Sequence, residues 1–486
     1  MESYFEKFRQ ETIGHNLHFQ TPYGLKKMIY ADWVASGRLY APIERKMAEE
    51  IGPYVGNTHT LTSETGTMMT NAYHLALKKI KQHVNSGPND VIITFGSGMT
   101  AVINKLQRIL GLKFCGNLTG KPCLKDSERP VVFITHMEHH SNHTSWFATS
   151  ADVVLLKPDK DLQVDLNELK FELEKYKDRK FKIGSFTACS NVTGVGTPFH
   201  AMAKLMHAYG GVCFVDFAAS APYMDMNMHP EDPLEKLDAV MFSPHKFLGG
   251  PGTSGVLVFD SSLYHNSTPD QPGGGTVEWT NAWGEYKYID DIEIREDGGT
   301  PGFLQAIRTA LCIELKNQIG VKNIHQREEE LVKIAFNELS KIPELHILAD
   351  NIKNRLGIMS FYIENIHYNL IVKLLNDRYG VQVRGGCACA GTYGHYLLDV
   401  TYEKSRKITN LINTGDLSQK PGWVRLSLHP TMTNEELYVI TDAILQIQEN
   451  HGEWEKDYIY DKHTNEFHHK VNTNASSERL EQWFQL

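Results

Sequence analysis

Short apolar runs alternate with amphipathic stretches over most of the chain before residue 300, and this alternation limits the fold more than any other feature. Short apolar runs bounded by turn residues are typical of buried strands, and the stretches between them have the helical period. The pattern predicts strands at 91–95, 131–135, 153–157, 182–187, 212–216, 239–243 and 254–259, and helices at 101–110, 166–176 and 199–209. Strands that alternate with helices indicate an α/β domain with a mostly parallel central sheet.

The pattern changes after about residue 300. Helices are expected at 302–319, 326–340 and 434–449, with short strands around 355–363 and 423–427. This mixture predicts a smaller α+β domain beside the large one. We expect a large domain at 21–305, a small domain at 1–20 and 306–450, and a polar tail at 451–486 that is either loose or docked on a partner.

Composition excludes several classes of protein. A chain of 486 residues with 41% hydrophobic content can bury a large core, and a net charge of −9 gives no reason to expect nucleic acid or an anionic membrane as partner. No stretch approaches the roughly 20 apolar residues that cross a bilayer, and the N-terminus lacks an apolar signal core. Seven scattered cysteines argue against a secreted disulfide framework. These features predict a cytoplasmic protein.

Two residues at the ends of neighbouring predicted strands carry the main chemical expectation. Asp216 ends the strand 212–216, and Lys246 follows the strand 239–243. Ligands bind beyond the carboxyl ends of parallel strands, so both side chains are expected at one edge of the sheet. A cofactor that forms an imine needs an amine, and a carboxylate that keeps its ring nitrogen protonated. Taken alone, such a pair is more often a surface lysine and a turn cap.

The residues around Lys246 favour a bound phosphate. Ser243 and His245 offer two donors, and the glycines of GGPGTSG at 249–255 let the backbone turn tightly beside them. This context predicts that Lys246 holds pyridoxal 5′-phosphate (PLP) as a Schiff base.

A second glycine-rich turn lies between a predicted strand and a predicted helix, at Gly96 and Gly98. The helix start at Met99 and Thr100 would present free amides and a hydroxyl to an anion. The turn has neither the Walker spacing nor the dinucleotide fingerprint.

Four histidines lie close together in THMEHHSNHTSW, at His136, His139, His140 and His143. Their spacing invites a metal interpretation, but HExxH is absent and the segment follows a strand end. A single histidine stacked on an aromatic cofactor explains the cluster equally well, so no metal site is expected.

These motifs, in this order, resemble the class V, fold-type I PLP enzymes, and within them the cysteine desulfurase and selenocysteine lyase branch. The resemblance runs from about Tyr30 to about Glu449. It implies a fold-type I PLP-dependent transferase fold, a small amino-acid substrate and a homodimer.

The resemblance also implies a role for each matching residue. Lys246 would bind the cofactor, Asp216 would pair with its ring nitrogen, and His139 would stack on the ring and help proton transfer. Asn191 would lie near the ring hydroxyl and the substrate, and Arg425 would grip the substrate α-carboxylate with its planar fork. The remaining matches form the phosphate cup: Met99, Thr100, Ser243, His245 and, from a second subunit, Thr300.

The segment VRGGCACAGTYGH at 383–395 resembles the loop that carries the persulfide-forming cysteine, and Cys389 falls on that nucleophile. A thiolate on a glycine-rich loop can attack the sulfur of a bound cysteine. The alternative is that Cys387 and Cys389 are two small buried residues. The working hypothesis is a cysteine desulfurase that forms L-alanine and a Cys389 persulfide, whose sulfur passes to an acceptor protein.

The chain departs from the family pattern in four places. Ala219 occupies the place of a glutamine that contacts the cofactor oxygen, and the cysteine loop lacks the histidines that precede the nucleophile. The segment 279–296 and the tail past His451 have no counterpart. These departures keep open a class V aminotransferase, an epimerase or another PLP lyase in which Cys389 is not catalytic. An inactive scaffold of the same fold is a third alternative.

Overall fold

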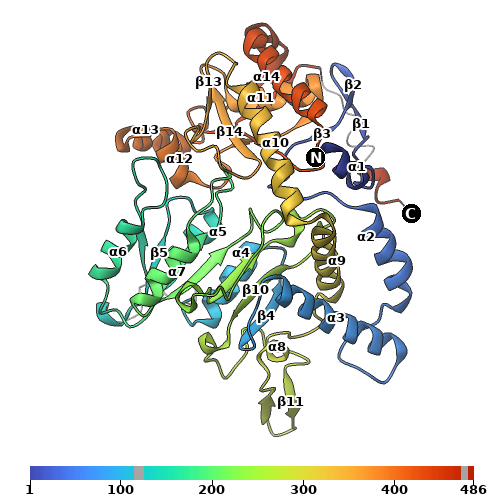
Figure 1. Ribbon diagram of the computed structural model, residues 1–486, viewed down its shortest axis with the longest axis vertical. Helices are drawn as coiled ribbons and strands as arrows, with labels where there is room; N and C mark the ends of the chain where they lie inside the picture. Colours follow the sequence, from blue (N-terminus) through green and yellow to red (C-terminus); the bar gives the residue numbers. More distant parts are fainter. Residues whose placement is uncertain (114–124, 472–479, 486) are drawn as a thin grey trace. The chain divides into compact units, whose positions relative to one another are not determined.

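The computed structural model describes residues 1–113, 125–471 and 480–485, which form two compact units (Figure 1). Unit 1 comprises Met1–Gln10, Gly14–Trp33 and Gln326–Leu486, and unit 2 comprises Glu11–Ile13 and Val34–His325. These bounds differ from the expected domains, because residues 21–33 belong with the C-terminal unit and residues 306–325 belong with the large one. No helix in the described ranges is long and apolar enough to cross a membrane.

Unit 2 is built on a seven-stranded sheet of order β4-β10-β9-β8-β7-β5-β6. Only β10 runs against its neighbours, so the sheet is mostly parallel, as expected. The strands are β4 (Asp90–Phe95), β5 (Val131–Ile134), β6 (Asp152–Leu155), β7 (Lys182–Thr187), β8 (Val212–Asp216), β9 (Ala239–Phe242) and β10 (Gly255–Asp260). All seven predicted strands are confirmed, with ends that differ by two residues at most.

Helices complete unit 2, and the three predicted before residue 300 are confirmed. They are α4 (Met99–Ile109), α6 (Leu166–Lys175) and α7 (Phe199–Ala208), to which the structure adds α3 (Glu64–His83) and α5 (His140–Phe147). Residues of α4 and of the strands share one buried core that includes Ile103, Ile134, Phe214 and Leu257. Strands buried in this way read as nearly continuous apolar runs, which explains why the sequence located them. The helix α9 (Phe303–Ile319), expected in the small domain, lies in unit 2 and packs on α3.

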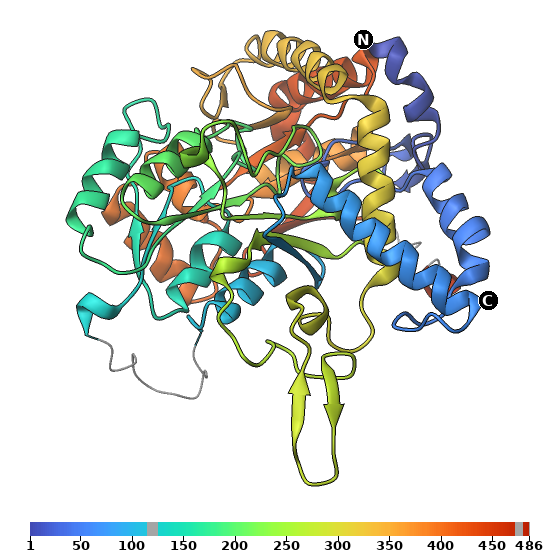
Figure 2. The ribbon, with the colours of Figure 1, turned by 60° about the horizontal axis from the view of Figure 1, so that its bottom comes forward.

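The segment 279–296 forms most of a β-hairpin and a short helix. Strands β11 (Val277–Thr280) and β12 (Tyr286–Tyr288) pair antiparallel, and α8 (Ile292–Arg295) follows them. The hairpin projects from the rest of unit 2 (Figures 1 and 2).

Unit 1 has the α+β character expected of the smaller domain. Its antiparallel sheet has the order β13-β14-β17-β16, formed by β13 (Leu345–Ile347), β14 (Ile358–Ile363), β17 (Trp423–Ser427) and β16 (Arg384–Gly386). Its longer helices are α13 (Tyr402–Asn413), α14 (Asn434–Trp454) and most of α10 (Val321–Leu339), which begins five residues before the predicted start. The early start of α10 follows from Gly320, whose φ of 84° ends α9 and lets a new helix begin at once.

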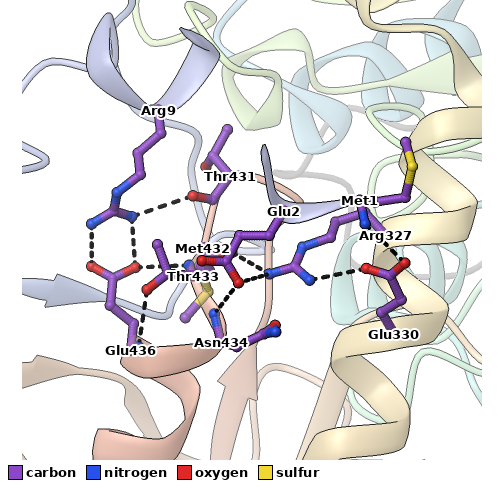
Figure 3. A network of polar contacts seen from close by, with 10 residues as sticks. All are labelled: Met1, Glu2, Arg9, Arg327, Glu330, Thr431, Met432, Thr433, Asn434 and Glu436. Atoms are coloured by element: carbon purple, nitrogen blue, oxygen red, sulfur yellow. Dashed lines mark hydrogen bonds and ion pairs between the residues drawn. The ribbon is translucent and has the colours of Figure 1, made fainter. Parts of the chain in front are cut away.

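The N-terminal helix α1 (Glu2–Gln10) is fastened to unit 1 by charged side chains (Figure 3). Arg9 makes two hydrogen bonds of 2.6 Å to the Glu436 carboxylate, and Glu2 accepts one of 2.9 Å from the Asn434 amide. The Arg327 guanidinium, almost fully buried, pairs with Glu330 and Glu2. These bonds join the start of the chain to the first turn of α14 and to α10.

The expectation of a loose or partner-docked tail from His451 onward is wrong for residues 451–471. Helix α14 continues to Trp454, and β18 (Tyr458–Asp461) and β19 (Glu466–His469) form an antiparallel hairpin in unit 1. The Arg378 guanidinium lies 4.0 Å from the ring centre of Tyr23 and 4.1 Å from that of Trp454, and it pairs with Asp457. Two cation–π contacts and an ion pair therefore hold this segment in unit 1, although its polar composition indicated a loose tail.

Candidate functional site

In unit 2, most of the predicted site residues follow strands that run in the same direction. The carboxyl ends of β4, β5, β7, β8 and β9 lie at one edge of the sheet, since these strands are parallel to one another. The residues that follow these five ends are Met99 and Thr100, His139, Asn191, Asp216, and Ser243 to Lys246. The topology therefore brings the predicted cofactor residues of unit 2, except Thr300, to one edge.

Asp216 is the buried carboxylate of this edge, with only 3% of its surface exposed. Its Oδ1 accepts a hydrogen bond of 2.8 Å from the Ala218 amide. Burial raises the pKa of Asp216 to about 6, while the Ala218 bond and the positive charge of Lys246 oppose that rise. A second cation placed beside this carboxylate would keep it ionised, which is what a protonated pyridine nitrogen supplies.

Lys246 is positioned by a short 3₁₀ turn, Pro244–Lys246, directly after β9. The Lys246 amide donates to the Ser243 carbonyl over 3.1 Å, and the Gly37 amide donates to the His245 carbonyl over 2.9 Å. The backbone that carries Lys246 is therefore held on both sides by hydrogen bonds.

Four residues of the predicted phosphate cup, Met99, Thr100, Ser243 and His245, lie at or beside the start of α4. The Met99 amide donates to Ser243 Oγ over 2.9 Å. A Cβ added to Gly98 would lie 2.9 Å from Ser243 Oγ and 3.6 Å from His245 Cδ2, so these groups surround the same turn. Burial lowers the pKa of His245 to about 4, so its ring is neutral at pH 7 and can still donate one hydrogen bond. A helix start with these donors suits an anion.

The two glycine-rich segments singled out in the sequence lie against each other. The Gly255 amide donates to the Gly96 carbonyl over 3.2 Å, and a Cβ on Gly255 would lie 2.6 Å from the Gly98 carbonyl oxygen. A larger residue at 255 would push away the turn that precedes Met99.

His139 caps the N-terminus of α5. Its Nδ1 accepts from the Ser141 amide over 3.1 Å and lies 3.0 Å from Ser141 Oγ, which in turn lies 2.6 Å from Thr100 Oγ1. These bonds connect the predicted stacking histidine with the predicted phosphate cup through Ser141, which the sequence analysis missed. Among the residues that the structure describes, no three His, Cys, Asp or Glu side chains gather as a metal site.

Glu138 is a second residue that the sequence analysis missed. It is buried, and its carboxylate accepts hydrogen bonds from Thr135 Oγ1 at 2.7 Å, Asn142 Nδ2 at 2.8 Å and the Thr187 amide at 2.9 Å. Burial raises the pKa of Glu138 to about 7, against the effect of these donors. The carboxylate ties the ends of β5 and β7 together beside His139. The only signal in the sequence is its place next to that histidine.

The turns after β7 and β8 carry the residues expected near the cofactor oxygen. Asn191 is buried in the first turn and Ala219 in the second. Ser220 is fully buried, and its Oγ has no hydrogen-bond partner among the described residues. Thr300 is exposed between α8 and α9, so its assignment to a neighbouring subunit stays a prediction.

The donor set fits PLP. Asp216 would hold the ring nitrogen, Lys246 would hold the carbonyl carbon, and the α4 start with Ser243 and His245 would hold the phosphate. The cofactor requires a buried carboxylate, an amine and an anion cup. The carboxylate ends β8, the amine follows β9, and the cup combines the turn after β9 with the start of α4.

Replacing Asp216 with asparagine should make the ligand-free protein more stable at neutral pH. A carboxyl whose folded-state pKa is raised above its unfolded value stabilises the fold at low pH, and that contribution is lost as pH rises through the folded pKa of about 6. Asparagine keeps an oxygen for the Ala218 amide and removes the charge, so the gain should reach about 3 kcal/mol at alkaline pH and shrink towards about pH 4.

Urea unfolding of both proteins, freed of cofactor, at pH values on either side of 6 measures this difference. A gain in stability that does not change with pH would contradict the assignment of the raised pKa to Asp216. The same substitution should weaken cofactor retention.

In unit 1, Arg425 lies on β17 with 4% of its surface exposed. Its Nη2 donates to Asp32 Oδ1 over 2.9 Å, and Arg384 Nε donates to the other oxygen of Asp32 over 3.1 Å. Burial lowers the pKa of Arg425, and the charge of Asp32 opposes this effect. One carboxylate thus orients two arginines. Asp32 is a third residue that the sequence analysis missed.

The two cysteines of the glycine-rich loop differ in exposure. Cys387 is half-buried and Cys389 is exposed, and both thiols are free. The interpretation that both are buried core residues is therefore wrong for Cys389. Ala388 and Cys389 have φ values of 48° and 57°, a left-handed conformation that residues other than glycine adopt infrequently.

Comparison with known proteins gives a family match and several curated relatives. A sequence model of the aminotransferase class-V family matches residues 29–440. A protein of Halalkalibacterium halodurans described as a probable cysteine desulfurase is 28% identical over 382 residues, which cover 77% of this chain and 86% of that protein. A Staphylococcus epidermidis protein with the same description is 29% identical over 372 residues, covering 75% and 84%.

Solved structures share the fold. A cysteine desulfurase from Thermococcus onnurineus, solved in its apo form, superposes with a TM-score of 0.72 at 22% identity and covers 92% of this chain and 98% of that one. A cysteine desulfurase from Escherichia coli gives a TM-score of 0.68 at 21% identity, with the same coverage.

Proposed function

The chain belongs to the aminotransferase class-V family, and from this premise we propose that it is a PLP-dependent cysteine desulfurase. The family is PLP-dependent, and the relatives and structures described above are named as cysteine desulfurases. The observation that carries the finer assignment is the exposed, left-handed Cys389 on a loop of the unit that also holds the buried Arg425.

The proposed reaction transfers one sulfur atom. The Cβ–S bond of L-cysteine breaks, and a new S–S bond forms between that sulfur and Cys389 Sγ. The electrons of the broken bond stay on Cβ, which takes up a proton, so the products are L-alanine and a persulfide on Cys389. No external oxidant or reductant is needed until the persulfide is passed on.

The residues of the chain would share the work. When bound, PLP supplies a protonated ring that withdraws electrons from the substrate Cα. Asp216 keeps that ring protonated, and Lys246 Nζ is the base that moves the Cα proton. Arg425 orients the substrate through its α-carboxylate. The nucleophile is Cys389, which attacks as the thiolate.

A class V aminotransferase, epimerase or other lyase is the second candidate, and two observations favour it. Ala219 brings a methyl group where the desulfurase pattern has a glutamine, and no histidine precedes Cys387 in the loop. In such an enzyme the substrate would still bind to Arg425, and Cys389 would have no part in turnover.

Incubation of the PLP-loaded protein with L-cysteine and dithiothreitol without oxygen, with assays of sulfide and alanine, tests the proposal. Equal amounts of both products are expected. If another amino acid reacts at the cofactor while L-cysteine yields neither sulfide nor alanine, the second candidate is favoured.

Two further parts of the proposal are a homodimer, completed by Thr300 of a second subunit, and a protein that accepts the sulfur.

Replacing Arg425 with lysine should raise the KM for L-cysteine about tenfold or more, because an ammonium cannot make the two parallel bonds of a guanidinium to a carboxylate. The charge is kept, so the Asp32 pairing should survive. Steady-state kinetics measure the effect. Arg384→Lys is the matched control, since Arg384 shares Asp32 but is more than half exposed. An equal rise of KM in both variants would contradict the proposal that Arg425 binds the substrate carboxylate.

A further inference from the structure

The C-terminal hairpin, defined as β18, β19 and the turn between them (458–469), lies beyond the residues matched by the family model. It packs in unit 1, on the helix α11 (Tyr368–Leu374) that lies beneath β16. The cysteine loop begins where β16 ends. The position of the hairpin therefore links it to the loop that carries Cys389.

The link starts at Asn465, in the turn of the hairpin. Its Nδ2 donates to the Tyr368 hydroxyl over 2.6 Å, and its backbone carbonyl accepts from Asn369 Nδ2 over 2.6 Å. Asn465 is 7% exposed, its φ is 64°, and its Oδ1 accepts from the Tyr460 hydroxyl over 2.8 Å. Every polar group of this side chain has a role, so the turn is built around it.

Aromatic rings close the same contact. His367 stacks on Tyr368 with ring centres 4.5 Å apart, and it lies 5.3 Å from both Tyr460 and Phe467. Phe467 is 8% exposed. The hairpin thus seals the first turn of α11 with apolar as well as polar contacts.

Tyr368 and Asn369 in turn lie directly against the glycines that flank the cysteine loop. A Cβ on Gly385 would overlap Asn369 Oδ1 and lie 3.2 Å from Tyr368 Cδ2. A Cβ on Gly422 would lie 2.6 Å from Tyr368 Cε1 and 2.9 Å from Gly386 Cα. Gly385 and Gly386 lead into the cysteine loop, and Gly422 leads out of the following helices into β17.

The hairpin turn also contacts the chain near the C-terminal end of the segment between β16 and β17. His463 Nδ1 is bonded to the Gly415 carbonyl at 2.8 Å, and the Leu417 amide donates to the Lys462 carbonyl over 2.8 Å. Residues 387–422 leave the sheet after β16 and return to it at β17. The hairpin turn therefore contacts the chain near both ends of the segment that carries Cys387 and Cys389.

We propose that the C-terminal hairpin is a brace that positions the cysteine-bearing segment 387–422, with Asn465 as its main positioning residue. The inference rests on the proposed function, in which Cys389 must reach the sulfur of the substrate. Asn465 touches no reacting atom, and it acts through Tyr368 and the glycines beneath the loop.

Asn465→Gly and Tyr368→Phe test the brace in the full-length protein. Glycine adopts a positive φ without strain, so the first variant removes the side-chain bonds without straining the turn, and the second removes only the hydroxyl. Backbone amides of 387–417 should exchange hydrogen about fivefold faster in Tyr368→Phe, as expected for the loss of one hydrogen bond. The increase in Asn465→Gly should be at least as large, because this variant also loses the bond from the Tyr460 hydroxyl, and the double variant should add little to it. Amides of β14 should be unchanged, as should all amides in the control Ile459→Ala, an exposed position of the same hairpin.

The positioning role predicts that kcat for alanine formation falls several-fold in both variants while the KM for L-cysteine is kept. Unchanged exchange in 387–417 would overturn the brace, and faster exchange with unchanged kcat would overturn its positioning role. Exchange is measured without substrate. A wild-type protein that forms no alanine would therefore refute the proposed function, and the exchange data would still decide whether the hairpin braces the loop.

Discussion

Lys246→Ala should abolish the absorbance of the Schiff base between this lysine and the cofactor, and lower amino-acid turnover by about a thousandfold or more, the upper range for loss of a positioned general base. Lys246 is expected both to hold PLP covalently and to move the Cα proton, and alanine can do neither. Its backbone bonds to Ser243 and through His245 do not involve the side chain, so the fold should be kept. Absorbance spectra of protein purified with excess PLP measure the first effect.

Lys204→Ala is the matched control for this change. Lys204 lies on α7 in a surface ion pair with Asp232, about half exposed, and such pairs contribute little to stability. Its loss should leave the absorbance and turnover unchanged. A Lys246→Ala protein that keeps an unaltered cofactor band would show that another amine holds PLP, and the assignment of the strand-end site would fail.

Cys389→Ser should keep the cofactor spectrum and lose sulfide and alanine production by about a hundredfold or more, because a hydroxyl is far less ionised than a thiol and a far weaker nucleophile. The thiol is exposed and belongs to unit 1, so serine should leave the cofactor residues of unit 2 untouched. Parallel assays of product formation and of cofactor absorbance separate the two effects.

The neighbouring cysteine provides the control for this second prediction. Cys387 lies two residues away on the same loop but is half-buried, and Cys387→Ser should retain most of the activity. Full turnover in Cys389→Ser would identify the enzyme as an aminotransferase or lyase with a cysteine that has no catalytic part. Loss of activity only in Cys387→Ser would identify Cys387 as the nucleophile.

The sheet of unit 2 and the convergence of Asp216 and Lys246 could be predicted because both depend on local patterns. Buried parallel strands appear in the sequence as apolar runs. Because these strands run in the same direction, their carboxyl ends lie at the same edge of the sheet. The glycines before Met99 and around Gly255 marked the turns, and the structure brings those turns into contact.

The supporting residues could not be predicted, because their partners are distant in the sequence. Asp32 and Arg425 are 393 positions apart, and no sequence pattern around Asp32 indicates that its partner is an arginine. Glu138 is a carboxylate within a polar stretch, and only the folded chain surrounds it with the Thr187 amide and Asn142. Positive φ at Cys389 has no sequence signal, since non-glycine residues seldom adopt it.

The C-terminal hairpin could not be predicted from the sequence for a different reason. Its composition is polar, which favours an unfolded tail. The few residues that it buries, Tyr458, Asn465 and Phe467, are spread over two short strands and the turn between them. A short strand with one buried residue carries too little periodicity to be recognised.

Peptide mass spectrometry of the PLP-loaded protein after one exposure to L-cysteine, without a thiol reductant, tests the central claim most directly. The peptide that contains Cys389 should be heavier by one sulfur atom, the added sulfur should be removed by dithiothreitol, and alanine should appear in equal amount. Alanine or another product formed while the Cys389 peptide keeps its mass would contradict the claim that this thiol receives the sulfur.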